Sequence, residues 1–295
     1  MALRVYSLIK MINSKDLEWA TFLYNVMYQD LSYLEDLQEV EKSLNTERPG
    51  KAVVGFLNNW RMRLSCNIVP DKINNWYNAD TKRVLEELPH SLLKIDFNKA
   101  HTVVNITTLF NSLDKITEIN DTGASKILHI IKPNIFVMWD NEIREHYLKD
   151  FQGKKNKAGS KAYLFFIQKM REIAIPICKE NKNIASDLSM KLKRLYEGNL
   201  RNHTEEREKS KLTDKINFLE KKGKSITKIL DEYNWIVITP DGFILPSEVL
   251  YPIILRNRSR VSQLRNIRYS DFTEILNTQS WIKYKNSISD LTDKS

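Results

Sequence analysis

Asp140 is the residue whose position best suits it for chemistry. It follows the apolar run 135–139 and precedes Asn141 and Glu142. The spacing of the next apolar residues predicts a helix that begins directly after Asp140, so this carboxylate caps the helix. The helix dipole and the free N–H groups of the first turn favour the ionised form there. A fixed carboxylate beside an apolar wall can stabilise a developing positive charge and orient or deprotonate water. As an alternative, Asp140 only caps the helix, a role worth about 1 kcal/mol.

A candidate phosphate site precedes Asp140 in the chain. Apolar residues at helical spacing predict two helices, over 103–116 and 124–132, with a polar turn at 117–123 between them and Pro133 ending the second. The first N–H groups of a helix have no internal partner and lie at the positive end of its dipole, so they suit a phosphate. The sequence therefore predicts phosphate binding by five consecutive residues, Thr122, Gly123, Ala124, Ser125 and Lys126.

Together these two features resemble the helix-hairpin-helix DNA glycosylases. That family has a Leu-Pro-Gly-apolar-Gly hairpin, a helix, and then an apolar segment that ends in Asp and is followed by a basic helix residue. Here 119–123 (INDTG) is similar to the hairpin, and 136–144 (FVMWDNEIR) is similar to the catalytic segment. Two details depart from the pattern. Asn120 and Asp121 replace Pro and Gly, and the gap between the hairpin and Asp140 is a few residues shorter.

The resemblance implies that Asp140 is the catalytic residue of a DNA glycosylase. Its carboxylate would stabilise the positive charge that builds on the sugar as an N-glycosidic bond breaks. Members that also cut the backbone carry Lys two positions after the last hairpin glycine, where this chain has Ser125, and Lys126 lies one position later. The resemblance therefore implies a monofunctional enzyme, which hydrolyses the bond of a flipped, damaged or modified base and leaves an abasic site.

A flipped base also requires a pocket, and the phosphates around it require cations. We expect Asn59 and Trp60, in a predicted helix over 52–64, to line the pocket together with Trp139, because a base needs both stacking and hydrogen bonds to its edge. As an alternative, this helix only buries one aromatic face. Phosphates are expected at Arg144 and at the loop 153–161, in which Lys154, Lys155 and Lys157 lie between two glycines and a fourth lysine follows. As an alternative of equal weight, this segment is only a solvated loop.

Composition is consistent with a DNA-binding protein but does not require one. The chain of 295 residues is 42% hydrophobic and 28% charged, as in an ordinary globular protein, and its net charge of +9 favours a polyanionic partner, here double-stranded DNA. Cys66 and Cys178 are too few for the four-thiolate iron–sulfur cluster that some glycosylases carry. No metal or other cofactor is expected. The opening residues show neither a signal peptide nor a membrane span, so we expect a cytoplasmic, nucleoid-associated protein.

The expected fold is mostly α. Residues 1–200 are predicted to form a helix-hairpin-helix glycosylase-like domain, and 201–295 a basic accessory region of small α+β type. The second region begins with a charged stretch, 201–224. It continues with a predicted β-hairpin over 235–245, whose turn is Pro240-Asp241-Gly242, and its tail carries Arg256, Arg258, Arg260, Arg265 and Arg268. It would either widen the DNA footprint or form a structural cap.

Three other functions remain open at the level of sequence. The hairpin can belong to a non-catalytic DNA-binding protein in which Asp140 only caps a helix. Asp140 and Glu142 can instead hold magnesium in a different phosphodiester enzyme. The least specific alternative is a protein-interaction domain. For a glycosylase, the identity of the base stays open. It can be a damaged base, removed in DNA repair, or a modified base of phage DNA, removed in anti-phage defence.

Overall fold

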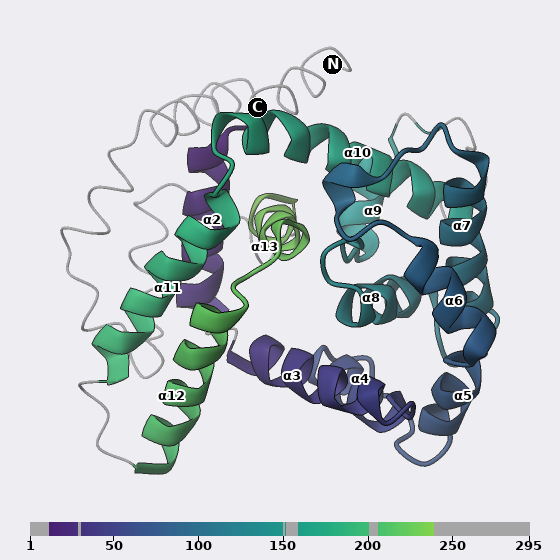
Figure 1. Ribbon diagram of the computed structural model, residues 1–295, viewed down its shortest axis with the longest axis horizontal. Coiled ribbons are helices and arrows are strands. Elements are labelled where there is room, and N and C mark those ends of the chain that lie inside the picture. Colours follow the sequence, from purple (N-terminus) through teal and green to yellow (C-terminus); the bar gives the residue numbers. More distant parts are fainter. Residues whose placement is uncertain (1–11, 29–30, 150, 152–158, 201–205, 239–295) are drawn as a thin grey trace, which may run out of the picture.

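A computed structural model describes residues 12–28, 31–149, 151, 159–200 and 206–238. These residues are mostly helical and contain no β-strand, as the prediction of a mostly α protein requires (Figure 1). The helices are α2 (Ser14–Tyr28), α3 (Leu31–Asn45), α4 (Gly50–Asn59), α5 (Val69–Trp76), α6 (Ala79–Glu87), the 3₁₀ turn η1 (Leu92–Lys94), α7 (Ala100–Asp114), α8 (Asp121–Ile131), α9 (Asn141–Tyr147), α10 (Ser160–Glu180), α11 (Ile184–Leu200), α12 (Glu206–Lys221) and α13 (Ile226–Ile238). No helix of this part of the chain is long and apolar enough to cross a membrane.

The helical hairpin is present where the sequence predicted it. α7 and α8 pack against each other and are joined by residues 115–120. Asn120 caps α8, because its side chain accepts a hydrogen bond from the Gly123 N–H at 2.9 Å. α8 ends just before Pro133, which has no N–H to continue the helix. The order of turn, helix and apolar run is therefore confirmed, whereas the specific glycosylase fold remains a prediction.

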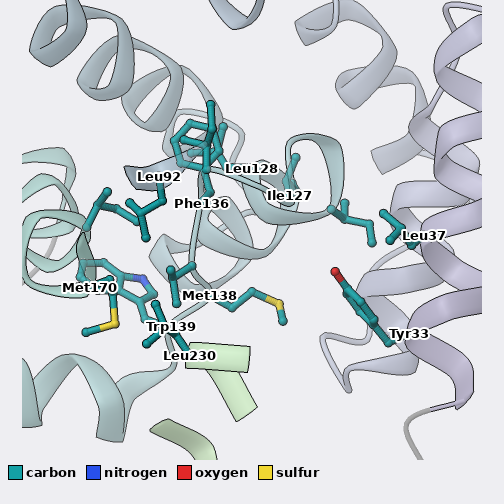
Figure 2. Close-up of a cluster of buried hydrophobic side chains, with 14 of the residues drawn as sticks. Tyr33, Leu37, Leu92, Ile127, Leu128, Phe136, Met138, Trp139, Met170 and Leu230 are labelled. Carbon is teal, nitrogen blue, oxygen red and sulfur yellow. The ribbon is translucent and has the colours of Figure 1, made fainter. Parts of the chain in front are cut away.

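The apolar run 135–139 lies in the middle of the core and positions Asp140. Figure 2 shows Trp139 of this run beside Met138, Met170 and Leu230. Its ring is 5.0 Å from that of Tyr163 and 5.4 Å from that of Phe166, centre to centre. Its Nε1 donates to the Asp121 carbonyl oxygen at 3.1 Å, which ties the run to the start of α8. Trp139 is only 1% exposed, so its predicted place in a base pocket is wrong: it is a core residue.

α13 is the central helix of the described chain. It packs against α2, α9, α10 and α11, and Figure 1 shows it end-on between these elements. The part of the chain after residue 200 that the structure describes is therefore in direct contact with the earlier helices. α13 is buried on every side, including the polar side chains of Thr227, Lys228 and Asn234.

The prediction of a first β-strand at 235–239 is wrong over the described residues. Residues 235–238 form the last turn of α13. A short run of Trp, Ile and Val fits a strand and a buried helix equally well, and here the preceding residues 226–234 already form the helix that the run continues. Residues 239–245 and the five arginines of the tail lie outside the described residues.

The predicted helix over 52–64 is also wrong at its end. α4 stops at Asn59, and Arg61 and Arg63 have left-handed backbones, with φ of 64° and 54°. The side chain of Asn58 causes the stop: its Oδ1 accepts from the Leu64 N–H at 2.6 Å, and its Nδ2 donates to the Leu64 carbonyl oxygen at 3.1 Å. Asn side chains favour such local bonds over helix continuation. Residues 60–64 thus form a tight loop after α4.

Candidate functional site

Asp140 stands where the sequence predicted it, as the N-cap of α9. Its Oδ1 accepts a hydrogen bond from the Ile143 N–H at 2.9 Å, and its side chain is half-buried. This bond fixes the direction of the carboxylate. The other carboxylate oxygen makes no part of the cap bond, so the cap leaves half of the group available for chemistry.

The ionisation of Asp140 differs from the expectation. Burial raises the pKa of this carboxyl above its ordinary value, and the negative charges of Glu142 and Asp231 act in the same direction. The Ile143 N–H and the Lys126 charge oppose the shift but do not cancel it. The cap bond lowers the pKa, as the sequence predicted, but the loss of water outweighs it, so the net shift is upward. A carboxylate with a raised pKa is a better proton acceptor.

Lys126, rather than Ser125, is the α8 residue that acts on Asp140. Its charge is among those that alter the pKa of Asp140, and its Nζ lies 5.2 Å from the centre of the Trp60 ring. Burial lowers the pKa of the Lys126 amine, and Lys228 lowers it further. Asp231 and Asp140 act in the opposite direction. Lys126 and Asp140 are therefore close enough for the charge of each to alter the pKa of the other.

Ser125 has a structural role in this arrangement. It is fully buried, and its hydroxyl lies 2.8 Å from the Thr122 carbonyl oxygen and accepts from the Trp139 N–H at 3.2 Å. The expected contact between this hydroxyl and a phosphate is therefore wrong. Ser125 instead joins α8 to the residue before Asp140.

α13 supplies two charged residues that sequence reasoning missed, Lys228 and Asp231. Lys228 Nζ donates to Asp231 Oδ2 at 3.0 Å, and both side chains are buried. The same Nζ lies 4.8, 4.5 and 4.7 Å from the ring centres of Tyr24, Tyr33 and Trp60, which surround the ammonium with aromatic faces. Lys126, Asp140, Lys228 and Asp231 form what we call the lysine–carboxylate cluster.

A signal for these residues exists in the sequence. Lys228 and Asp231 are three positions apart and enclose the apolar pair Ile229-Leu230, and charged residues that pair at this spacing on a buried helix are uncommon. The assignment of 235–245 to a β-hairpin hid the helix on which they lie. Lys224, two residues before α13 begins, forms a second buried pair with Glu232 of that helix.

A buried histidine connects the cluster to α3. His129 Nδ1 lies 2.7 Å from the Phe136 carbonyl oxygen and must donate to it, which leaves Nε2 to accept from the Tyr33 hydroxyl at 2.8 Å. Complete burial lowers the pKa of His129 to about 3, so the ring is neutral. This chain of bonds fixes the Tyr33 ring that packs on Lys228.

The start of α8 is covered, contrary to the prediction of a phosphate site there. Gly123 and Ala124 are buried, and the Gly123 N–H is bonded to the Asn120 side chain. The place that a Cβ on Gly123 would take lies 3.0 Å from Met62 Cε, so the loop after α4 lies on this turn. Thr122 is half-buried at its edge. Backbone contact between Gly123 and a phosphate is thus excluded in this conformation.

Arg144 lines a pocket on another side of α8. The pocket has a volume of about 580 Å³ and is lined by Asp114, Asn120, Asp121, Thr122, Asn141, Arg144 and Gly159. Arg144 Nη1 donates to Asp121 Oδ2 at 3.3 Å, and Nη2 donates to Asn141 Oδ1 at 3.0 Å. Asp121 also accepts from the Gly159 N–H at 2.9 Å. The pocket therefore holds an arginine whose charge is largely compensated by an acid.

The remaining candidate residues separate into three groups. Trp60 is half-buried and belongs to the site, because Lys126 and Lys228 both lie over its ring. Asn59 is exposed and donates to Asp36 Oδ1 at 2.9 Å, so it points toward α3. Lys154, Lys155 and Lys157 lie outside the described residues.

Neither metal ligation nor similarity to other proteins adds to this geometry. Among the residues that the structure describes, no three His, Cys, Asp or Glu side chains gather as a metal site. Comparison of the chain with protein-family models, curated proteins and solved structures found no match. The functional argument therefore depends on the residues themselves.

Proposed function

We propose that the protein is a DNA glycosylase that hydrolyses the N-glycosidic bond of a flipped base. The observation that carries the proposal is the placement of Asp140: a half-buried carboxylate with a raised pKa, fixed as a helix cap directly after a helical hairpin. Lys126 and the Trp60 ring belong to the same site. A carboxylate, a cation and an aromatic face are the groups that this reaction uses.

The reaction assigns a role to each of these groups. As the C1′–N bond breaks, its electrons leave with the base, and the sugar becomes positively charged. The Asp140 carboxylate stabilises that charge and takes a proton from the water that attacks C1′. Trp60 offers a face on which the base stacks. The products are the free base and an abasic site.

A second candidate activity follows from Lys126. Since its charge acts on Asp140, we propose the Lys126 amine as an alternative nucleophile at C1′. The enzyme would then cut the strand through an imine instead of stopping at the abasic site. Hydrolysis remains our first choice, because the position two residues after Gly123, where the resembled strand-cutting enzymes carry their lysine, holds Ser125.

The proposed partner is double-stranded DNA, in repair or in defence against phage, and such a substrate would place the protein on the nucleoid. Arg61 and Arg63 are exposed on the loop that covers the hairpin. Their left-handed backbone conformation is unfavourable for residues other than glycine, and such strain is often found at functional sites. We propose that they contact phosphates beside the site. Arg144, the lysines of 153–161 and the basic region 201–295 would contact more distant phosphates.

Base release from a panel of DNAs tests the proposal. The panel contains oxidised, alkylated, deaminated, mismatched and phage-modified DNA, incubated in EDTA and then treated with alkali to reveal abasic sites. We expect alkali-dependent breaks with wild-type protein and with Glu142→Gln, and none with Asp140→Asn. Breaks that need no alkali favour the Lys126 activity, and restoration by magnesium favours a metal-dependent enzyme. Unchanged DNA binding without product on any substrate would favour the non-catalytic DNA-binding protein.

A further inference from the structure

Three buried polar side chains meet where α2 packs against the start of α13. Asn25 is 2% exposed, Lys224 5% and Glu232 0%. Lys224 Nζ donates to Asn25 Oδ1 at 2.9 Å and also donates to Glu232 Oε1. Asn25 Nδ2 donates to Glu232 Oε2 at 3.4 Å. One carboxylate therefore contacts both the amine and the amide nitrogen, while the amine contacts the amide oxygen.

Donors from neighbouring helices hold the amide and the lysine in this arrangement. The Tyr196 hydroxyl of α11 donates to Asn25 Oδ1 at 3.0 Å, so this oxygen accepts from two donors. The Lys224 N–H donates to Ser189 Oγ, also of α11, at 2.7 Å, which fixes the turn before α13. A carbonyl with two donors on its oxygen is polarised toward attack by a nucleophile.

Lys228 also faces Glu232 from within α13. Its Nζ lies 3.9 Å from Glu232 Oε1, but it donates to Asp231 Oδ2 at 3.0 Å and so has a counter-ion of its own. An ion pair between Lys224 and Glu232 would require neither an amide in contact with both nor a hydroxyl on the amide oxygen. Buried charges are also costly, and transfer of a proton from Lys224 to Glu232 leaves a neutral acid and an amine with a lone pair.

We propose that Lys224 and Asn25 join in an isopeptide bond, an amide between their side chains, with Glu232 as the acid–base catalyst. Glu232 takes a proton from the Lys224 ammonium group, and the amine then attacks Asn25 Cγ. The electrons of the C=O bond move to Oδ1, where the Tyr196 hydroxyl stabilises the negative charge. Glu232 gives its proton to Nδ2, the C–Nδ2 bond breaks as the carbonyl forms again, and ammonia leaves. The new amide nitrogen returns its extra proton to Glu232.

The bond closes a loop between two residues that are 199 positions apart in the chain. Such a cross-link removes conformations from the unfolded chain, and the loss increases with loop length. It also fastens α13, which carries Lys228 and Asp231 of the lysine–carboxylate cluster, to α2. The inference is independent of the proposed function, because the reaction needs no DNA.

The mass of the full-length wild-type chain is the first measurement. After incubation until the mass is constant, we expect it to be lower than the mass of the encoded chain by one ammonia molecule. Tandem mass spectrometry of a digest should then find Asn25 and Lys224 in one linked pair of peptides. Glu232→Gln, which keeps the size of the side chain but cannot take the proton, should retain its full mass. Tyr196→Phe should form the bond about a hundredfold more slowly.

Lys222→Gln is the matched control, because it removes an exposed lysine close to Lys224 together with its ion pair to Glu41. It should form the bond at the wild-type rate. A wild-type chain that keeps its full mass would overturn the proposal, whether or not any variant folds. Loss of ammonia without a linked pair of peptides would indicate a succinimide at an asparagine and would overturn it as well. A bond that forms equally fast in Glu232→Gln would overturn the role of Glu232.

Discussion

Two charged sites lie on different sides of α8, and they differ in how their charges are paired. The pocket beside Arg144 is the more open one, and its arginine is compensated: Asp121 accepts from both Arg144 and the Gly159 N–H, although burial and the Asp121 charge raise the pKa of Asp114 in its lining. The lysine–carboxylate cluster is more enclosed, and burial displaces the pKa values of Lys126 and Asp140 in it. Groups that are displaced from their ordinary ionisation are those expected at reacting atoms. In this protein, the open cavity is therefore a weaker guide to the reacting groups than the buried ionisable residues with displaced pKa values.

The largest expected difference is between two Asp→Asn variants, one in each site, compared by their rates of base release. Asp140→Asn should lower base release about a hundredfold or more, because the transition state loses its carboxylate, while Asn still caps α9 and keeps the fold. Asp121→Asn, in the pocket, should leave base release within a few-fold of wild type. Single-turnover rates on one substrate measure both. Equal losses in the two variants would end the distinction between the sites.

Asp121, which is expected to matter little for base release, should matter for the stability of the fold. Asp121→Ala removes the partner of Arg144 and of the Gly159 N–H, and bonds to charged groups of this kind contribute about 2 kcal/mol. We expect that loss in urea unfolding, against no more than about 0.5 kcal/mol for Glu142→Ala, which is exposed on the neighbouring helix. A small effect at Asp121 would mean that the pocket is not held together by its ion pair.

His129, which is hydrogen-bonded to the Tyr33 hydroxyl beside the lysine–carboxylate cluster, should make the stability of the protein depend on pH. Its pKa in the folded protein is about 3 and its ordinary value is 6.5, so between these values the unfolded chain binds a proton that the folded chain does not. Stability contributed by this group is present above pH 6.5 and falls by at most about 1.4 kcal/mol for each unit of pH below it.

The variant that isolates this effect is His129→Asn, whose amide can still donate to the Phe136 carbonyl oxygen. We expect a shallower slope of unfolding free energy between pH 6 and 5 than in wild type, whatever the loss at pH 7. His90→Asn, at an exposed histidine, is the control and should retain the wild-type slope. A slope that survives in His129→Asn would assign it to His146 instead, because burial lowers the pKa of that ring too.

The smallest effect is expected at the start of α8. In Gly123→Ala the new methyl would press on Met62 Cε, the movable end of a side chain, and on Ile119. This cost opposes a gain in helix propensity of about 1 kcal/mol, so net stability should change by less than that. DNA affinity, measured by fluorescence anisotropy, should stay unchanged because Gly123 is covered. A large loss of affinity at constant stability would show that the loop opens and exposes the hairpin to phosphate.

The sequence was sufficient for features that depend on neighbouring residues. The α7–α8 hairpin, the buried run 135–139 and the capping role of Asp140 all follow from spacing, and all are confirmed. It was insufficient where distant segments meet. The pKa of Asp140 is shifted upward by burial and, to a smaller extent, by charges that include Asp231, which is 91 residues away in the chain.

Local bonds also misled the reading of single side chains. Ser125 has the chemistry of a phosphate ligand, but its hydroxyl is taken by the backbone of Trp139. Trp139 has the chemistry of a stacking platform, but it fills the core, and Trp60 stands in the site instead. Residue type sets what a side chain can do, while the fold decides which of its atoms face solvent.

The central place of α13 also determines when the site comes into existence. Its main neighbour is α2, at the other end of the described chain, and Lys228 and Asp231 reach the cluster only when these helices meet. Contacts between such distant segments form late in folding. During synthesis, Asp140 and Lys126 therefore leave the ribosome before their counter-charges do. The nascent chain therefore carries Lys126 and Asp140 before the cluster around them is complete, and under the proposed function activity would begin only when α13 packs against α2.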